Sequence, residues 1–372
     1  MRRRRILITG GAGFIGSHLA DELLAAGHTV RALDSLVSQV HPERSRPDYL
    51  DPDVELVVGD VRDRSAVDRA LKGIDAVYHL AARVGVGQSM YELCDYTSTN
   101  VGGTSTLLEA LIAAPVERLI VASSMSIYGE GLYRDVRGTQ IPVAERHMDD
   151  IIAGRWDPVD AAGRPLTPLP TPETKLPSLK SVYALTKYDQ ERLCLMIGQA
   201  YRISTVAMRF FNVYGPRQAL SNPYTGVLAI FGSRLLNGRA PIVYEDGQQR
   251  RDFVSVYDVA RALHLALDAP AAEGQAVNVG SGVSSSVREI ADRMAAALGV
   301  KGLAADVTGQ HRVGDIRHCF ADITRAREVL GYQPQVPLDE GMLELAAWLG
   351  GQDAYDRVAE ANAELAARGL TV

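Results

Sequence analysis

A tyrosine and a lysine stand four positions apart in the run SVYALTKYDQ, as Tyr183 and Lys187. In a helix, this spacing places both side chains on one face. A phenol is a poor base at neutral pH, but a neighbouring ammonium group stabilises the phenolate, so such a pair can take a proton from a hydroxyl group. The lysine can also reach a ribose. The pattern also occurs by chance, as an exposed tyrosine beside a solvated lysine, so its meaning depends on the groups around it.

A glycine-rich turn near the start of the chain predicts a dinucleotide site. The run ITGGAGFIGSHLADELL places Gly10, Gly13 and Gly16 between a predicted strand and a predicted helix. Positions without side chains let the backbone turn tightly and approach a pyrophosphate at the helix N-terminus. Asp34 ends the next predicted strand, where a carboxylate can bind both ribose hydroxyls. Because Asp34 would repel a 2′-phosphate, the pattern favours NAD over NADP; the alternative is a purely structural glycine turn.

The elements that must position these groups form an α/β pattern. Short apolar runs alternate with helical patterns from Ile6 to about Ala122. This alternation predicts repeated βαβ units and a Rossmann-type doubly wound parallel sheet. The run around Tyr183 predicts a long helix followed by a strand. At another strand end, VGDVRD, Asp60 suits an adenine amino group, and Asp63 suits the cap of the next helix.

The sequence divides into three predicted parts. Residues 1–215 are expected to form an NAD-binding domain, 216–350 mainly a smaller α/β lobe that binds the substrate, and 351–372 a helical tail that packs without visible chemistry. Some strands of the second part are expected to return to the main sheet. An insertion at 131–180 is rich in proline toward its end and has no strong periodicity. Such long loops are functional or disordered, so the insertion either covers the pocket or decorates the surface.

Composition and charge exclude several classes of protein. A net charge of −6 over 372 residues gives no reason to expect binding to nucleic acid or to a membrane, and the basic run Arg2 to Arg5 is expected to solubilise the first strand. Cys94, Cys194 and Cys319 form no CxxC pair, which argues against disulfides and against a bound metal. No apolar stretch reaches the ~20 residues of a membrane span, and no signal-peptide pattern is seen. We therefore expect a cytoplasmic protein.

Ordered motifs over nearly the whole chain resemble the extended short-chain dehydrogenase/reductase family of nucleotide-sugar epimerases and dehydratases. These motifs are TGGAGFIG, HLAA, TNVGGT, SSMSIYG, YALTK, RFFNVYGPRQ, RRDFVSVYDVA and RVGDIRHCFADITRAREVLGY. Within this family the chain is most similar to nucleoside-diphosphate-sugar 4-epimerases. The runs RVGVGQSMYE and SNPYTGVLAIF look like those of dTDP-L-rhamnose 4-epimerases.

The resemblance implies a role for each group of matching residues. The catalytic residues would be Ser124, Tyr183 and Lys187. NAD would be bound by Gly10, Gly13, Phe14, Ile15, Gly16, Asp34, Asp60, Val61, Leu80, Ala81, Ala82, Asn100, Tyr183, Lys187 and Phe211. The nucleotide sugar would be bound by Ser124, Met125, Ser126, Asn212, Arg251, Arg312, Asp315 and Cys319. Arginine suits a diphosphate because its planar fork donates two parallel hydrogen bonds. Asp315 would suit the nucleotide ribose, and the small Cys319 would leave room for a larger or repositioned sugar.

In the implied reaction, Tyr183 as phenolate takes the proton of the sugar 4-hydroxyl, Ser124 orients that hydroxyl, and C4 passes its hydride to a resident NAD. Lys187 and the positive nicotinamide would together lower the pKa of the tyrosine. The 4-keto sugar then turns over in the pocket, and the hydride returns to its opposite face. The resemblance therefore implies inversion at C4 without net oxidation.

The run SSMSIYG separates this chemistry from elimination. The 4,6-dehydratases of the family carry acidic residues directly after the serine or threonine, because loss of water across C5 and C6 needs an acid and a base. Here those positions are Met125 and Ser126. Neither a thioether nor a hydroxyl group does that proton chemistry at neutral pH. The sequence therefore favours oxidation and reduction at C4 alone, with Met125 packing against the site.

Several alternatives stay open on the sequence. The substrate could be a UDP-hexose or a UDP-uronic acid, or the enzyme could be a 4-ketoreductase that consumes NADH. A different class is an NAD-binding sensor without turnover, because a fold does not fix a function. The intact Ser124, Tyr183 and Lys187 argue against the sensor. Relatives form dimers through two helices per subunit, here near 92–113 and 181–201, so we expect a homodimer.

Overall fold

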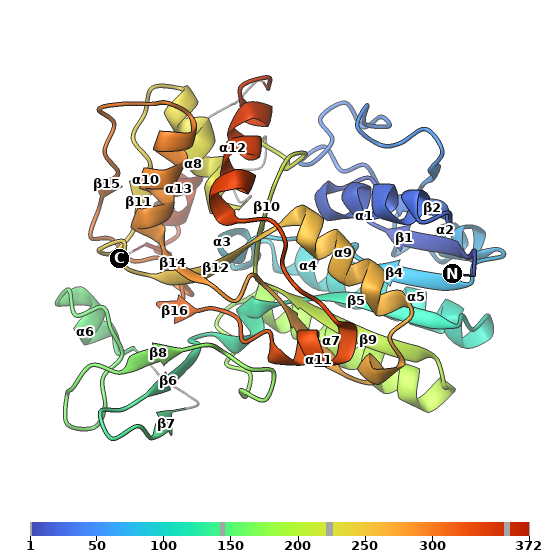
Figure 1. Ribbon diagram of the computed structural model, residues 1–372, viewed down its shortest axis with the longest axis horizontal. Helices are drawn as coiled ribbons and strands as arrows, with labels where there is room; N and C mark the ends of the chain where they lie inside the picture. The colour runs from blue at the N-terminus through green and yellow to red at the C-terminus, as the bar shows by residue number, and fades with distance from the viewer. Residues whose placement is uncertain (1, 142–145, 221–225, 353–357, 372) are drawn as a thin grey trace.

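The computed structural model describes residues 2–141, 146–220, 226–352 and 358–371, and its main sheet lies where the alternating pattern predicts it (Figure 1). Within the described residues this sheet has seven parallel strands in the order β13-β9-β5-β4-β1-β2-β3. The strands are β1 (Arg5–Thr9), β2 (Thr29–Asp34), β3 (Glu55–Val58), β4 (Ala76–His79), β5 (Arg118–Ser124), β9 (Ser204–Phe210) and β13 (Ala276–Val279). The strand order reverses direction next to β1, as in a Rossmann-type sheet. The predicted fold class is therefore confirmed.

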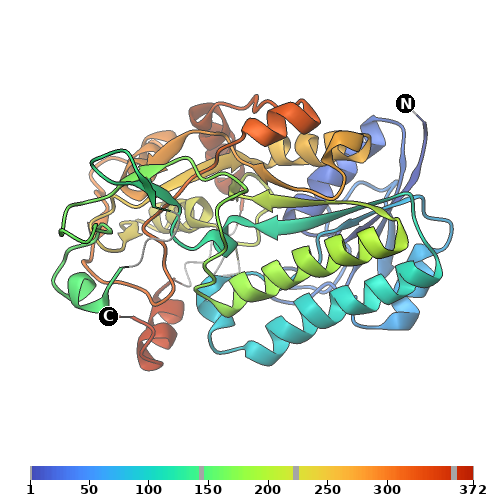
Figure 2. The same cartoon turned by 90° about the horizontal axis from the view of Figure 1, so that it is seen from below.

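Helices cover both faces of the main sheet (Figure 2). One face packs against α1 (Phe14–Ala25), α9 (Val256–Leu267) and α11 (Thr324–Leu330). The other packs against α2 (Arg64–Leu71), α5 (Gly103–Ala113) and α7 (Val182–Tyr201). The side chain of Asp63 accepts a hydrogen bond from the backbone N–H of Ser65 and caps α2, as the sequence predicts. Ser181 caps α7 in the same way, so the helix begins just before Tyr183.

Short helical segments follow the carboxyl ends of two central strands. After β4 come α3 (Val86–Ser89), α4 (Leu93–Tyr96) and a π-helical turn η1 (Thr97–Gly102), which continues into α5. After β5 comes a 3₁₀ turn η2 (Met125–Tyr128). Ser124 caps this turn, because its side-chain oxygen accepts a hydrogen bond from the N–H of Ser126. The end of β5 is therefore held in a fixed geometry.

The insertion at 131–180 contains regular structure of its own. It consists of β6 (Leu132–Arg134), β7 (Gln140–Ile141) and β8 (Thr167–Leu169) in a small antiparallel sheet, with a short α6 (Met148–Ile152). Strands of two or three residues are too short to give a periodic sequence pattern. The expectation of a loop without regular elements was therefore wrong for this segment. Figure 1 shows it beside β16 and the lobe.

The C-terminal part of the chain serves both halves of the molecule. The lobe contains β10 (Asn212–Tyr214), β11 (Ile242–Val243), β12 (Arg250–Ser255), β14 (Ser284–Ser286), β15 (Asp306–Val307), β16 (His318–Cys319), α8 (Val227–Leu236), α10 (Val287–Ala297) and α12 (Leu338–Leu349). A short η3 (Pro270–Ala272) follows α9, and α13 (Val358–Ala367) lies near the end of the chain. The lobe has its own core around Phe231, Met294 and Leu345. However, β13 pairs with β9, and α9 packs on α1, so residues 216–350 also complete the main sheet.

Among the described residues, no helix is both long and apolar enough to cross a membrane.

Candidate active site

A cavity of about 970 Å³ opens at the carboxyl ends of the central strands, between the main sheet and the lobe. Its size is at the upper end of the range for small-molecule sites. The predicted residues that line it are Gly10, Gly13, Phe14, Ile15, Gly16, Asp34, Asp60, Val61, Leu80, Ala81, Ala82, Ser124, Met125, Ser126, Tyr183, Lys187, Phe211, Asn212, Arg251, Arg312 and Asp315. Two predicted residues, Asn100 and Cys319, are not among the lining residues.

The glycine turn forms a cradle that only a bare backbone allows. Gly10 has φ +71°, a conformation that side chains disfavour, and a Cβ on Gly16 would lie 2.3 Å from the carbonyl oxygen of Gly10. Asp34 faces the same cavity, and its two oxygens accept hydrogen bonds from the N–H groups of Ala12 and Leu36, each at 3.0 Å. Each carboxylate oxygen keeps a second lone pair for a ribose hydroxyl. These residues therefore fit a dinucleotide.

Asp60 also reaches the cavity, but its carboxylate is paired. The Arg62 guanidinium donates to both Asp60 oxygens, with a shortest contact of 2.6 Å from Nη2 to Oδ2. Arg62 lines the cavity as well, although no sequence motif pointed to it. The expected contact of Asp60 with an adenine amino group stays a prediction. If it forms, the Asp60 carboxylate would make it while also paired with Arg62.

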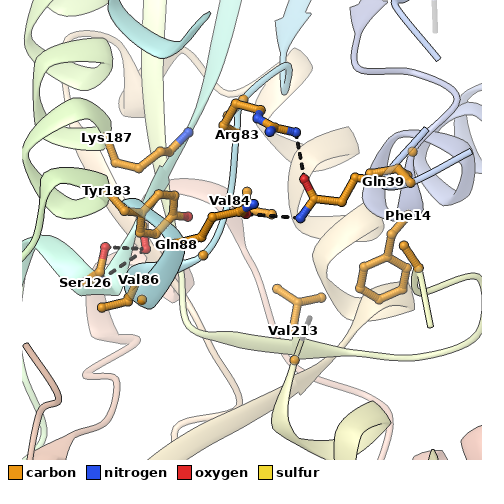
Figure 3. A pocket seen from close by; sticks show the side chains of 18 of the residues that line it. Phe14, Gln39, Arg83, Val84, Val86, Gln88, Ser126, Tyr183, Lys187 and Val213 are labelled. Atoms are coloured by element: carbon orange, nitrogen blue, oxygen red, sulfur yellow. Dashed lines mark hydrogen bonds between the residues drawn. The ribbon is translucent and has the colours of Figure 1, made fainter. Parts of the chain in front are cut away.

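A polar clasp crosses the cofactor end of the cavity. It consists of Gln39 from the loop after β2 and of Arg83 and Gln88 from the segment after β4 (Figure 3). Gln39 Nε2 donates to Gln88 Oε1 at 3.0 Å, and Arg83 Nη1 donates to Gln39 Oε1 at 2.8 Å. Arg83 is anchored in turn by Asp95, 2.6 Å from its Nε. The run RVGVGQS directly after HLAA was the available signal for Arg83 and Gln88, whereas nothing marked Gln39.

The predicted catalytic side chains meet at the end of β5. Ser126 Oγ donates to Ser124 Oγ at 2.9 Å, and the Ser126 N–H donates to the same oxygen at 3.1 Å. The Ser124 hydroxyl lies near enough to the Tyr183 side chain to favour its phenolate and lower its pKa. The backbone N–H of Tyr183 donates to Ser89 Oγ at 3.0 Å, which ties the start of α7 to α3. Figure 3 shows Ser126, Tyr183 and Lys187 along one wall of the cavity.

Burial controls the charges of the tyrosine and the lysine. It raises the pKa of Tyr183, and the hydrogen bond with Ser124 lowers that pKa by less. Burial also lowers the pKa of Lys187, which is 3% exposed, to about 8. Lys187 Nζ donates to Gln190 Oε1 at 2.8 Å. The expected lowering of this pKa by Lys187 together with the positive nicotinamide stays a prediction, because it needs the charge of bound NAD as well as that of the lysine.

A buried hydrogen-bond network fixes Lys187 from behind. Gln190 Nε2 donates to Thr104 Oγ1 at 2.9 Å, and His79 Nε2 lies 2.8 Å from the same oxygen. Burial and the nearby Lys187 charge lower the pKa of His79 to about 3, so this histidine is neutral at physiological pH. The other ring nitrogen, Nδ1, lies 2.8 Å from Thr9 Oγ1. The network links α7 to β1, β4 and α5.

Asn100 supports the site from outside the cavity. Its Nδ2 donates to the carbonyl oxygen of Arg83 and to Thr186 Oγ1, both at 3.0 Å, and its Oδ1 accepts from the Arg83 N–H at 2.6 Å. The amide is fully buried in η1. The side-chain amide of Asn100 therefore positions the backbone of Arg83. This geometry does not indicate direct binding of NAD by Asn100.

The lobe side of the cavity carries the predicted substrate residues. Asn212 Oδ1 is buried and has no hydrogen-bond partner among the described residues. Arg312 Nε lies 2.9 Å from Asp315 Oδ2, and the Arg312 guanidinium stacks 4.4 Å from the centre of the Tyr244 ring. Arg251 Nη1 donates to the carbonyl oxygen of Arg317 at 2.9 Å. An unpaired amide oxygen and two arginines thus face one region of the cavity.

Cys319 lies behind this region. It is 1% exposed in β16, and its Sγ lies 3.9 Å from Thr171 Oγ1 in the insertion. Burial raises the pKa of the thiol to about 12. The expected direct effect of Cys319 on sugar size is therefore not supported, since the insertion and not the cavity is its neighbour.

Other lining residues could not be identified from the sequence motifs. Tyr244, Gln249, Leu365 and Leu370 line the cavity. The last two come from the tail, which was expected only to pack. Of the run SNPYTGVLAIF, residues 221–225 lie outside the described residues, while Val227 and Leu228 line the cavity. Within the described part of the chain, no group of three or more His, Cys, Asp and Glu residues could hold a metal ion.

Comparisons with known proteins agree with this geometry. The model of the NAD dependent epimerase/dehydratase family matches residues 6–148 and 160–280. A dTDP-L-rhamnose 4-epimerase from Burkholderia thailandensis is 36% identical over 93% of this chain and 95% of its own. A UDP-glucose 4-epimerase from Mycolicibacterium smegmatis is 37% identical over 91% of this chain and 96% of its own.

A solved UDP-glucose 4-epimerase from Thermus thermophilus, in complex with NAD, has a TM-score of 0.73 and 32% identity, and the match covers 93% of this chain and 99% of that one. The family model spans the glycine cradle, Asp34 and the Tyr183–Lys187 pair, and the binding and catalytic roles of these residues stay predictions. The chain belongs to the NAD dependent epimerase/dehydratase family.

Proposed function

We propose that this enzyme is a 4-epimerase of a nucleoside-diphosphate sugar, with a dTDP-L-rhamnose-like substrate, acting through a transient 4-keto sugar. The observation that carries the proposal is the end of β5. Ser124 and Tyr183 line the same cavity, and Met125 and Ser126 occupy its wall where elimination would need carboxyl groups. The wall can therefore handle the proton of one hydroxyl group and has no acid for a leaving water.

Each side chain of the site has a separate role in the reaction at C4 of the sugar. Ser124 Oγ accepts two hydrogen bonds from Ser126, so its own proton is directed toward Tyr183 or a substrate hydroxyl. Tyr183 takes the 4-hydroxyl proton as the C–H bond breaks, and returns it when the opposite face is reduced. Bound NAD supplies the reversible hydride acceptor and a positive charge that favours the phenolate. Lys187, fixed by its hydrogen bond to Gln190, adds a second positive charge on the same helix as Tyr183.

The nearest downstream carboxylate is held away from this chemistry. Glu130 is 5% exposed and does not line the cavity. Its oxygens accept hydrogen bonds from Tyr133 Oη at 2.8 Å and from Arg146 Nε at 3.0 Å. A carboxylate engaged in this way cannot replace the missing acid at positions 125 and 126. This supports epimerisation over dehydration.

The lobe supplies groups suited to the nucleotide and the diphosphate. Asn212 offers an unpaired amide oxygen, and Arg251 and Arg312 bring positive charge. Asp315 can accept from a ribose hydroxyl in addition to Arg312. The dTDP-L-rhamnose assignment is supported by the Burkholderia relative. The runner-up is a UDP-hexose, which is supported by the equally similar Mycolicibacterium UDP-glucose 4-epimerase.

The test is turnover by the purified protein without added NAD. It is incubated with dTDP-L-rhamnose and, separately, with UDP-glucose, and the stereochemistry at C4 is followed by proton NMR. We expect conversion of the rhamnose compound only, and conversion by Tyr183→Phe that is slower by about 10²–10⁴-fold. Conversion of UDP-glucose alone would transfer the assignment to the runner-up. A requirement for stoichiometric NADH would indicate a 4-ketoreductase, and no reaction with either sugar would overturn the proposal.

We also propose that the chain forms a homodimer through α4, α5 and α7. Leu93 on α4 and Leu185 and Met196 on α7 are 43–50% exposed. Leu185 and Met196 are three helical turns apart and share one face of α7. Apolar side chains gathered on neighbouring helices are typical of an interface. Light scattering should give a dimer for the native chain and a monomer for Leu185→Glu, whereas Leu343→Glu on α12 should remain a dimer.

A further inference from the structure

The tail of the chain forms part of the cavity wall. Leu365 lies on α13, is 4% exposed and lines the cavity together with Leu370. The cavity that these two leucines line is the same one that contains Ser124, Tyr183 and Lys187. Figure 2 shows the C-terminal helix below the lobe, close to the carboxyl-end side of the main sheet. The tail therefore contacts the space that the reactants must occupy.

Local backbone geometry explains why both leucines face the same way. Gly369 has φ +70° directly after the last turn of α13. The N–H of Gly369 donates to the carbonyl oxygen of Ala366 at 3.0 Å, and the N–H of Leu370 donates to that of Leu365 at 2.9 Å. This is the hydrogen-bond pattern of a Schellman motif, which brings the residue after the glycine against the residue five positions earlier. The sequence LAARGL thus builds a two-leucine surface.

The tail is attached to both sides of the cavity. On the lobe side, the N–H of Val313 donates to the carbonyl oxygen of Leu370 at 3.0 Å, and Arg312 forms an antiparallel bridge with Thr371. On the other side, the Arg368 guanidinium stacks 4.2 Å from the centre of the Tyr91 ring. Tyr91 follows α3, whose Ser89 holds the start of α7 at Tyr183. The tail therefore joins the Arg312–Asp315 loop to the segment beside the catalytic helix.

We propose that residues 365–371 are a substrate-binding element that covers the nucleotide part of the nucleoside-diphosphate sugar. The proposal rests on the function proposed above and adds to it the residues Leu365 and Leu370. Their apolar surface lies next to Arg312, which is stacked on Tyr244. An apolar surface beside a stacked aromatic ring suits a pyrimidine base, whereas charged groups nearby suit the diphosphate.

The role of residues 365–371 can be tested by measuring how tightly the protein binds the nucleotide alone, a measurement that needs no catalytic reaction. The NAD-loaded full-length protein is titrated with dTDP and with UDP by calorimetry, as the native chain, as Leu370→Ser and as Leu343→Ser. Leu343 is also a leucine but is 58% exposed on α12 and does not line the cavity. Losing the contact of one leucine should weaken binding of the preferred nucleotide about tenfold in Leu370→Ser. Leu343→Ser should bind like the native chain, and NAD content should be equal in all three.

Trypsin gives a second measurement that does not depend on a variant. Arg368 is exposed, so cleavage after it releases the residues that follow. Saturating nucleotide should slow this cleavage several-fold, as measured by mass spectrometry, because a nucleotide bound against Leu365 and Leu370 stabilises the packed tail. Equal affinity of Leu370→Ser and the native chain, together with unchanged cleavage, would overturn the role of the tail. If the native chain binds neither dTDP nor UDP, the proposed function itself fails.

Discussion

Arg146 joins the insertion to the loop that carries Asp315, and its removal should lower stability strongly. The side chain is 5% exposed, with Nη1 at 2.6 Å from Glu245 Oε1 and Nε at 3.0 Å from Glu130 Oε1. Nη2 donates to the carbonyl oxygen of Asp315 at 2.8 Å. In Arg146→Leu, two buried carboxylates lose their shared cation.

The loss of stability in Arg146→Leu depends on which positive groups still contact the two carboxylates. Removing one partner of a buried ion pair costs roughly 3–5 kcal/mol. Arg317 Nη1 still lies 3.0 Å from Glu245 Oε2, and the Arg317 N–H still donates to Glu130, so we expect the lower end, about 3 kcal/mol. Unfolding entropy is about 2.1 cal/mol/K per residue, which for 372 residues converts this loss to a fall in Tm of about 4 °C.

Differential scanning calorimetry on the native chain, Arg146→Leu and Arg155→Leu measures this loss. Arg155 lies in the same insertion and pairs with Asp150, but it is 63% exposed. An exposed pair contributes about 0–1 kcal/mol, so this control should lower Tm by no more than about 1 °C. A Tm of Arg146→Leu within 1 °C of the control would refute the reasoning, because it would mean that the buried charges are not what holds the insertion.

Other predictions concern acid stability, cofactor retention and catalysis. Burial raises the pKa of Glu245, but His311, Arg146 and Arg317 together lower it from its ordinary 4.5 to about 2. The ionised carboxylate therefore adds about 3 kcal/mol to the free energy of unfolding above pH 4.5, and this contribution is lost as the pH falls toward 2. The Tm deficit of Glu245→Gln should therefore be large at pH 7 and shrink below pH 4.5, and a deficit independent of pH would contradict this. Gln39→Ala opens the clasp and should speed loss of NAD about tenfold on gel filtration, while Gln248→Ala should not. Tyr183→Phe should lower kcat about 10²–10⁴-fold with NAD still bound, and normal turnover by this variant would exclude Tyr183 as the base.

The main sheet and the cofactor cradle could be predicted because their signals are local. The glycine turn, the strand that ends at Asp34 and the YxxxK helix each need only a short window of sequence. The strands β6, β7 and β8 gave no such signal, because two or three residues cannot show a period. Arg146 and Glu245 were not recognised as partners because they are 99 positions apart, and no short-range pattern encodes that contact.

Side-chain direction was the other limit. Motif similarity places Asn100 and Cys319 near the site, but packing turns the amide of Asn100 toward Arg83 and the thiol of Cys319 toward Thr171. The tail could be predicted as an amphipathic helix, yet amphipathicity does not say which surface a helix covers. Leu365 therefore looked like an ordinary packing residue.

The pairing of β13 with β9 has a consequence for synthesis of the chain. Residues 1–215 contain the cradle and the catalytic pair, but α9 packs on the apolar face of α1 and β13 pairs with the outer edge of β9. A ribosome adds about 5–20 residues per second, so the finished N-terminal half waits several seconds for its last strand. During that time it presents an open strand edge, a known route to aggregation. We expect the 1–215 fragment to be insoluble when expressed alone and a fragment ending after α12, which completes the lobe core, to be soluble.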